Sequence, residues 1–199
     1  MDSKRCPCWT QHPLMREYHD NEWGRPVHSD QKHFEMIVLE VMQCGLNWLM
    51  ILQKREVFRR CFQGFSPEKA AAFTEEDIER ILGTEGMIRS ARKIRAVIRN
   101  AEKFLAIAAE YGSFDAYLWG FTGGKTLIYP ENIPEPFPAK NKLSDEISRD
   151  LKNRGFQYLG SLTVYAHLQA CGLINDHDRS CPLFESLSNA HSHQYREVF

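Results

Sequence analysis

The sequence lacks any apolar run long enough to cross a membrane. No window of about 18 apolar residues occurs among its 199 residues. The first residues, Met1 to Arg5, lead into cysteine and proline rather than into an apolar leader. We therefore expect no membrane partner and no secretory signal, and we expect a cytoplasmic protein. In that setting the six cysteines are expected to be thiols or metal ligands rather than disulfides.

An excess of charge of one sign is also missing. The formal net charge is −1 and the pI is about 6.7, which excludes a strongly basic nucleic-acid-binding domain. One local basic stripe, from Arg89 to Arg99, is interpreted either as a solvated helix face or as a phosphate contact. Walker loops, GxSxG elbows and HExxH motifs are absent from the sequence.

Alternating runs typical of a β-sheet are missing too, and helical spacing dominates instead. Asp30 is expected to cap a helix whose apolar stripe stops before Gly45, and Ser144 is expected to cap a later helix. Glycines and prolines between residues 122 and 141 predict an irregular loop with a short extended piece. The polar tail, about 182–199, is expected to be loosely held. The sequence therefore predicts a single all-α domain over the whole chain.

Candidate metal ligands stand at both ends of the chain. Cys6, Cys8 and His19 lie near the start, and His177 and Cys181 lie four residues apart near the end. Cysteine and histidine are the residues that bind zinc, and a structural zinc site takes four ligands. One ion would then tie the two ends of the fold together. The spacing matches no standard zinc finger, so surface histidines with reduced cysteines are the alternative interpretation.

A turn bounded by glycines separates two helical patterns at residues 152–161. Gly155 allows a close approach of the backbone to a partner. Backbone N–H groups at Gly160 and Ser161 open the second helix, where they can hold a phosphate. Such a hairpin binds the DNA backbone without a basic surface, because amide donors replace lysine and arginine. An ordinary connector between two helices is the alternative.

Glu40 lies on a predicted helix among largely apolar neighbours. A carboxylate buried there without a partner is costly and its pKa rises, which marks an acid–base or binding role. Tyr18, Trp23 and Trp48 can supply flat faces that stack on a base. A salt bridge or a solvated position is the alternative for Glu40, and core packing is the alternative for the aromatic residues.

Taken together, these segments resemble the 3-methyladenine DNA glycosylase I family. The resemblance runs from about Cys6 to Cys181, nearly the whole chain. The blocks that carry it are YHDNEWG at 18–24, FEMI at 34–37, LE at 39–40, GL at 45–46 with Trp48, RGF at 154–156, QACGL at 169–173 and NDH at 175–177. So many blocks in one order are specific, although each block alone is not.

The resemblance implies an all-α fold, the helix-hairpin-helix DNA glycosylase fold, with the hairpin at about 144–172. It also implies one structural Zn²⁺ per chain, which joins the N- and C-terminal segments. The implied ligands are Cys6, His19, His177 and Cys181. Cys6 is preferred to Cys8 because it keeps the family's spacing to the YHD block. Four protein ligands leave no open position for a reacting water.

The resemblance further implies hydrolysis of the N-glycosidic bond of 3-methyladenine in alkylated double-stranded DNA. A monomer would extrude the damaged nucleotide from the base stack. Glu40 is then the catalytic residue, which hydrogen-bonds the extruded base and complements its positive charge. Tyr18 and Trp48 stack on the base, and Trp23 is a weaker pocket candidate. The implied DNA contacts are Gly45 and Leu46 in the gap left by the base, and Gly155, Gly160 and Ser161 on the backbone.

Two positions depart from the family's usual pattern. Val41 and Met42 stand where the family usually has glycine and glutamine, which adds bulk and removes a polar group near the base. They motivate one alternative function, a non-catalytic binder of alkylated DNA on the same fold. Another alternative is a metal phosphohydrolase of the His-Asp type, because His-Asp dipeptides occur at 19–20 and 177–178. Cys181 argues against it, since carboxylates should outnumber thiols at a hydrolytic metal centre.

Overall fold

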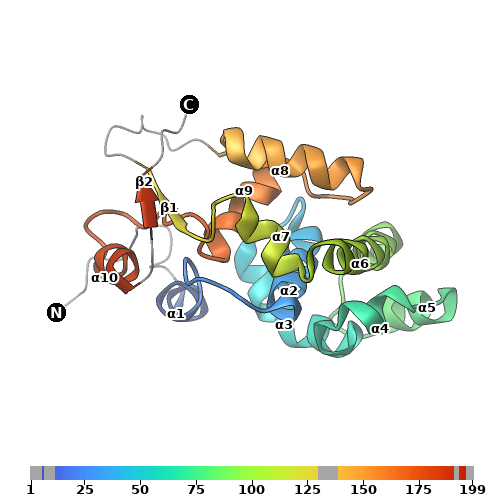
Figure 1. Cartoon of the computed structure of the whole chain (residues 1–199). Helices are drawn as coiled ribbons and strands as arrows, with labels where there is room; N and C mark the ends of the chain where they lie inside the picture. Colours follow the sequence, from blue (N-terminus) through green and yellow to red (C-terminus); the bar gives the residue numbers. More distant parts are fainter. Residues whose placement is uncertain (1–5, 7–11, 130–138, 191–192, 196–199) are drawn as a thin grey trace.

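Helices account for nearly all of the fold (Figure 1). The computed structural model describes residues 6, 12–129, 139–190 and 193–195. In this part of the chain the elements are, in order, α1 (Pro13–Asn21), α2 (Asp30–Gln43), α3 (Trp48–Cys61), the 3-10 helix η2 (Gln63–Phe65), α4 (Pro67–Ala71), α5 (Glu75–Gly83), α6 (Ala91–Tyr111), α7 (Phe114–Gly120), β1 (Thr126–Ile128), α8 (Lys142–Asn153), α9 (Ser161–Ala170), α10 (Pro182–Ala190) and β2 (His193–Tyr195). The mostly helical fold confirms the predicted class. Within the described segments, no helix has both the length and the apolar character needed to cross a membrane.

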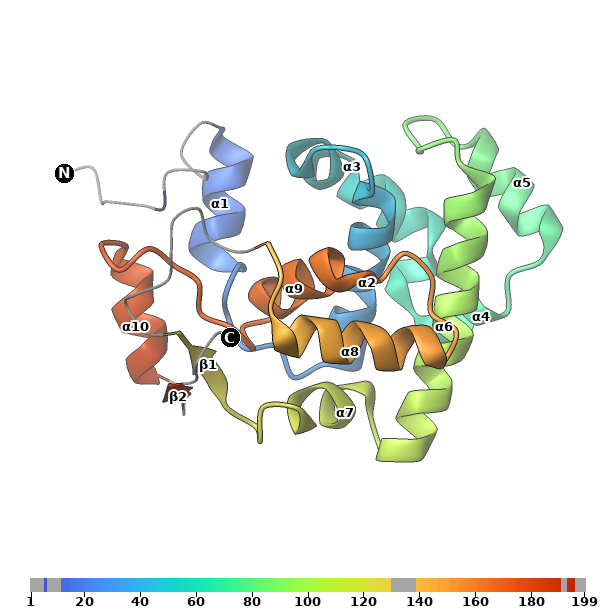
Figure 2. The ribbon, with the colours of Figure 1, turned by 90° about the horizontal axis from the view of Figure 1, so that it is seen from above.

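α2 lies in the middle of the molecule, as two perpendicular views show (Figure 1; Figure 2). One end holds α1, α10 and the two strands, and the other end holds α4, α5 and α6. α2 packs against α3, α6, α7 and α9, and its side chains from His33 to Met42 are all buried. A helix covered on all sides is usually apolar all round. The buried carboxylates of Glu35 and Glu40 and the buried imidazole of His33 on α2 therefore need a specific explanation.

The two helix caps expected at Asp30 and Ser144 differ from the prediction. Ser29 occupies the cap position of α2, whereas the Asp30 carboxylate accepts hydrogen bonds of 3.0 and 2.9 Å from the first two N–H groups of α7. Asp30 thus caps a helix more than 80 residues away in the sequence. For α8, the cap is Asn141, and Ser144 is its partner in a capping box.

The described part of the C-terminal tail, which was predicted to be loosely held, forms α10 and β2, and the rest of the tail lies outside the described residues. Leu187 of α10 is buried, and the Asn175 amide donates hydrogen bonds of 3.1 Å to Phe184 O and to Ser188 Oγ. β2 pairs in parallel with β1, with Thr126 opposite His193. For residues 182–190 and 193–195 the prediction of a loose tail is wrong, and so is the prediction of no sheet, because the partners that hold these segments lie far away in sequence.

The irregular loop predicted between residues 122 and 141 is partly described. Its expected extended piece is β1, whose three residues are all buried. The Leu127 N–H donates to Leu173 O at 2.8 Å, which ties the strand to the segment after α9. Residues 130–138, where most of the predicted proline-containing loop falls, lie outside the described residues.

Candidate functional site

Glu40 is a buried carboxylate near the end of α2. The residue is 3% exposed, and Oε2 has no hydrogen-bond partner in the described part of the chain. Burial raises the pKa of Glu40 to about 8, so the free protein carries this group mostly protonated at pH 7. The buried carboxylate expected from the sequence is therefore present, and a solvated position is excluded.

Tyr18 of α1 and Trp48 of α3 lie beside this carboxylate. Burial, and after it the charge of Glu40, raise the pKa of Tyr18 well above its ordinary value, which places the phenol close to the carboxyl group. The Tyr18 and Trp48 rings have centroids 5.5 Å apart and are tilted by 57°. Trp48 Nε1 is buried and has no acceptor among the described residues. Three helices thus bring together one carboxyl group, two aromatic rings and one unused N–H donor.

A groove of about 440 Å³ runs past Glu40 between α2 and α9. Gln43 contributes to the α2 wall, and Leu162 and Thr163 contribute from the first turn of α9. Leu162 is 60% exposed, which is unusual for a leucine and leaves an apolar side chain at the mouth of the groove. The groove therefore connects the buried carboxyl group with the exposed start of α9.

The turn between α8 and α9 is held in a strained shape by α6. Asn100, which is fully buried, donates to Gln157 O at 3.0 Å and accepts from Gln157 N–H at 2.8 Å. Tyr158 has a φ of 63°, which is left-handed and costly for a residue other than glycine, and Gly155 has a φ of 96°. Gly160 caps α9 without any side-chain hydrogen bond. The N–H groups that open α9 are therefore not used by a capping side chain.

The corner between α2 and α3 is held by Lys93 of α6. Its ammonium group donates to Met42 O at 2.7 Å and to Cys44 O at 2.8 Å. Gly45, at the tip of the corner, is exposed and has a φ of 80°, and Leu46 beside it is half-buried. A cation on the last carbonyls of a helix complements its dipole. The corner that carries the predicted gap-filling residues is therefore anchored to α6.

The basic stripe from Arg89 to Arg99 is largely engaged within the protein. Lys93 is buried, so it does not belong to the exposed basic face. Arg95 pairs with Glu75, Arg99 donates to Gly155 O at 3.1 Å, and Arg92 lies over the Tyr158 ring at 5.4 Å. The stripe therefore supports the turn before α9 more than it forms a separate phosphate surface.

Asn100 and Lys93 are supporting residues that the sequence did not single out. A signal for Asn100 does exist, because this polar residue lies on the apolar stripe of α6 among Val97, Ala101 and Phe104. Asparagine in a helix interior is unfavourable unless its amide has a partner. The signal for Lys93 was hidden, because the neighbouring arginines made it look like one member of a charged face.

The predicted metal ligands from the two ends of the chain lie together. Cys6, His19 and Cys181 each place one ligand atom within 4.8 Å of the others, and His19 Nε2 is 3.8 Å from Cys181 Sγ. Zinc bonds of about 2.0–2.1 Å to nitrogen and 2.3 Å to sulfur imply about 3.6 Å for that edge of a tetrahedral site. The donors and their spacing therefore fit a zinc ion. Cys8, the alternative N-terminal ligand, lies outside the described residues.

His177, the fourth expected ligand, lies beside these three residues. Its ring centroid is 5.1 Å from that of His19, and its Nε2 is buried without a hydrogen-bond partner in the described segments. His177 Nδ1 lies 3.0 Å from Asn175 Oδ1, and His19 Nδ1 lies 2.8 Å from Asp20 Oδ1. Such contacts to one ring nitrogen orient the other towards a metal. A Cβ at Gly24 would lie 2.4 Å from His177 Cε1, so only glycine leaves the ring in place.

Trp23 packs against this terminal cluster. Its ring centroid lies 4.5 Å from that of His177 and 6.0 Å from that of His19. These contacts place Trp23 next to the candidate zinc ligands, where it shields them from water. All four candidate ligands are buried, so the alternative of surface histidines is wrong.

Comparisons with known proteins decide the family. The family model described as methyladenine glycosylase matches residues 8–185. DNA-3-methyladenine glycosylase 1 of Escherichia coli (strain K12) is 42% identical over 178 residues, which cover 89% of this chain and 95% of that protein. The chain belongs to the methyladenine glycosylase family.

Solved structures agree with this assignment. A crystal structure of 3-methyladenine DNA glycosylase I matches with a TM-score of 0.84 and 43% identity, over 90% of this chain and 98% of that one. A crystal structure of a variant of 3-methyladenine DNA glycosylase I in complex with 3-methyladenine matches with a TM-score of 0.84 and 33% identity, over 89% of this chain and 96% of that one.

Two residues that depart from the family pattern lie away from the groove of this methyladenine glycosylase. Val41 and Met42 are both 0% exposed, and neither lines the groove. Their extra bulk is therefore taken up in the core around α2. The phosphohydrolase alternative also fails on the geometry, because Asp20 contacts His19 Nδ1 at 2.8 Å and two of the gathered donors are thiols.

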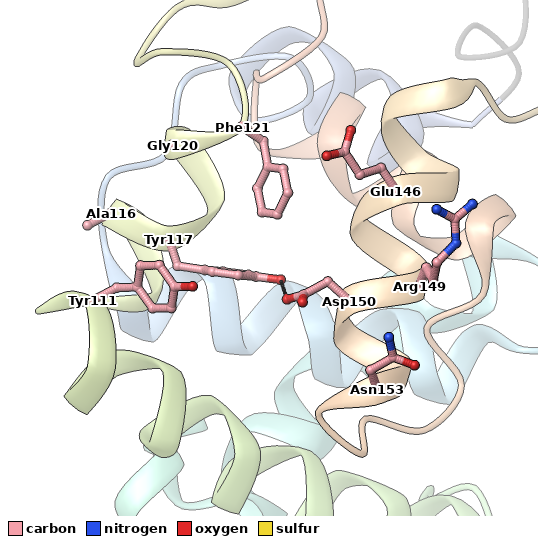
Figure 3. A pocket seen from close by; sticks show the side chains of 9 residues that line it. All are labelled: Tyr111, Ala116, Tyr117, Gly120, Phe121, Glu146, Arg149, Asp150 and Asn153. Atoms are coloured by element: carbon pink, nitrogen blue, oxygen red, sulfur yellow. Dashed lines mark hydrogen bonds between the residues drawn. The ribbon is translucent and has the colours of Figure 1, made fainter.

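A second pocket, of about 470 Å³, lies between α7 and α8 and is separate from Glu40 (Figure 3). Tyr117 and Phe121 line one side, and Glu146 and Asp150 line the other. The Tyr117 hydroxyl donates to Asp150 at 2.7 Å. Arg149 also lines this pocket, and Asp150 pairs with Arg154 at 2.7 Å, so the pocket carries charges of both signs.

Proposed function

We propose that this methyladenine glycosylase hydrolyses the N-glycosidic bond of 3-methyladenine in double-stranded DNA and that it acts as a monomer. The observation that carries the proposal is the unpaired Glu40 carboxyl group beside Tyr18 and Trp48, at the wall of a groove that ends at the start of α9. The names of its relatives, DNA-3-methyladenine glycosylases, support the same substrate.

The chemistry of the lesion explains why one buried carboxyl group is enough. Methylation at N3 gives the base a positive charge while it is attached to the sugar. When the bond to C1′ breaks, the base leaves with the bonding pair as a neutral molecule and needs no proton. Water then adds to C1′ and loses a proton. The protein therefore has to extrude and hold a cationic base, and strong acid catalysis is unnecessary.

Glu40 suits the recognition of a cationic base. A positive charge at contact distance favours the ionised carboxylate and opposes the effect of burial on its pKa. The carboxylate then pairs with the extruded base, whereas a neutral, undamaged base leaves the carboxyl group protonated and unpaired. Tyr18 and Trp48 add stacking with a cation–π contribution of about 1–2 kcal/mol, and Trp48 Nε1–H is a free donor for a base nitrogen.

The DNA backbone is assigned to the α8–α9 turn. Gly155, Gly160 and Ser161 present backbone groups at the start of α9, where N–H donors and the helix dipole attract a phosphate. The apolar Leu162 beside them faces the groove mouth. Gly45 and Leu46, which follow Gln43 of the α2 wall in the chain, are the residues that we expect to enter the gap left by the extruded base, as the resemblance implied.

We also propose that Cys6, His19, His177 and Cys181 hold one structural Zn²⁺. Three observations support this assignment: the clustering of Cys6, His19 and Cys181, the 3.8 Å distance between His19 Nε2 and Cys181 Sγ, and a His177 Nε2 that has no partner among the described residues. When bound, the ion would link Cys6 and His19, near the N-terminus, to His177 and Cys181, before α10, and it would leave no open position for a reacting water. The reaction then belongs to the Glu40 groove, and the metal stabilises the end of the molecule where the termini meet.

Base release from methylated duplex DNA tests the function. The full chain is expected to release free 3-methyladenine under single-turnover conditions and to leave undamaged DNA intact. The remaining alternative is a binder without activity, which would hold a duplex containing an abasic-site analogue tightly and release no base. Failure of the wild-type chain to release 3-methyladenine would refute the enzymatic proposal.

A further inference from the structure

A second group of metal-ligand side chains lies inside the molecule, where α2 meets α9. His33 from the first turn of α2, His167 from the last turn of α9 and Cys171 directly after α9 are all buried. Each offers one ligand atom, and these atoms lie within 4.8 Å of one another. None of the three lines the Glu40 groove or belongs to the terminal cluster.

The spacing within this group matches zinc chemistry. His167 and Cys171 stand four residues apart, so they share one face of α9, and His167 Nε2 is 3.7 Å from Cys171 Sγ. A tetrahedral zinc site predicts about 3.6 Å for a nitrogen–sulfur edge. The terminal cluster shows nearly the same distance, 3.8 Å, between His19 Nε2 and Cys181 Sγ. The two groups therefore have the same donor types at the same separation.

Two ring nitrogens in this group have no partner. His33 Nδ1 and His167 Nδ1 are buried and have no hydrogen bond within the described segments. Buried polar groups are nearly always hydrogen-bonded, and each unsatisfied one costs about 1–3 kcal/mol. Ordinary core histidines would be expected to use both nitrogens. A metal ion can account for His33 Nδ1, which remains available as a ligand atom, whereas in His167 the atom close to the thiol is Nε2. The two ring centroids are 5.8 Å apart.

Asp115 gives the group the arrangement found behind metal-binding histidines. Its Oδ1 is 3.1 Å from His33 Nε2, and a carboxylate on one ring nitrogen leaves the other as the donor.

We propose that His33, His167 and Cys171 bind a second transition-metal ion of the borderline-soft class, with Zn²⁺ as the expected occupant. Two imidazoles and one thiol select such an ion over Mg²⁺ or Ca²⁺, which prefer oxygen ligands. The ion joins α2, which carries Glu40, to α9, which carries Gly160 and Ser161 at its start. It would therefore hold the two walls of the groove at a fixed separation.

Counting ions in the full chain tests this site. The wild type and its variants are loaded with Zn²⁺, freed of excess metal, and measured by native mass spectrometry and by elemental analysis. Cys171→Ser and His33→Leu are each expected to hold one ion fewer than the wild type. Cys61→Ser removes a buried thiol outside both groups, and it is expected to hold the wild-type number.

The two sites are separated by a further pair of variants. Cys181→Ser is expected to lose one ion, and the double variant Cys171→Ser with Cys181→Ser is expected to lose two. A folded His33→Leu chain with the wild-type ion count overturns the proposal. If Cys171→Ser does not fold, His33→Leu decides, because leucine fills the buried position without an unsatisfied nitrogen. The ion count is independent of base release, so either proposal can fail alone.

Discussion

Replacing Glu40 with glutamine removes the carboxyl group that lies unpaired among the described residues of the groove, and it keeps the size of the side chain. A carboxylate and a cationic base at about 4 Å attract by about 4 kcal/mol in a medium of effective dielectric constant 20. Ionising Glu40 at pH 7 costs about 1.4 kcal/mol of this, because burial raises its pKa to about 8. The remaining 2–3 kcal/mol is the free energy of interaction with the base that Glu40→Gln is expected to lose, which corresponds to a drop in the efficiency of base release on the order of 30- to 150-fold.

The loss should fall mainly on apparent affinity. The positive charge moves from the base towards the sugar as the glycosidic bond breaks, so the carboxylate stabilises the extruded state more than the transition state. Single-turnover release of 3-methyladenine, measured over a range of protein concentrations, separates the two effects. Glu146→Gln is the matched control, because it removes an exposed carboxylate from the other pocket.

The pH dependence gives an independent check of the same reasoning. Below a pKa of about 8 the ionised fraction of Glu40 falls tenfold for each pH unit. Wild-type efficiency should therefore rise between pH 6 and pH 8, whereas Glu40→Gln should show no such rise. Release by Glu40→Gln within threefold of the wild type at pH 8 would remove the carboxylate from recognition.

The remaining predictions concern stability and support. Because burial raises the folded-state pKa of Glu40, the unfolding free energy of the wild type should fall as the pH rises from 4.5 to about 8, by up to about 1.4 kcal/mol per pH unit. Glu40→Gln should not show this fall. Urea unfolding at pH 5 and pH 8 measures the difference. Gly24→Ala should displace His177 and lower both zinc content and melting temperature, whereas Gly83→Ala, which meets no atom within 4 Å, should change neither. Asn100→Ala should lower the unfolding free energy by about 1–3 kcal/mol, because it leaves backbone groups of the α8–α9 turn unpaired. It should also weaken duplex binding in fluorescence anisotropy, and unchanged binding would show that the turn does not contact DNA.

Much of the candidate site was accessible to sequence reasoning because its signals are local. Apolar spacing around Glu40 predicted its burial, since neighbours three and four residues away on a helix share a face. The family blocks singled out Tyr18 and Trp48, and the structure does place their rings 5.5 Å apart. The turn before α9 was also predicted, because glycines mark it within a few residues.

Other parts depend on chain segments that meet only after folding. Asp30 reads as the cap of its own helix, yet it caps α7. Lys93 reads as part of a charged face, yet its ammonium group lies on the carbonyls of Met42 and Cys44. The sequence around Asp30 or Lys93 does not predict these partners, because the packing of the helices decides which distant residues meet.

By itself, the sequence determined the helical class, the buried carboxylate on α2 and the set of residues from which the terminal cluster is drawn. These follow from short-range periodicity and from residue types that bind metal. Only the tertiary structure decided that residues 182–190 and 193–195 form α10 and β2, that Val41 and Met42 face the core, and that His33 lies beside His167. Such contacts join residues far apart in the chain, and packing of whole helices, rather than local preference, brings them together.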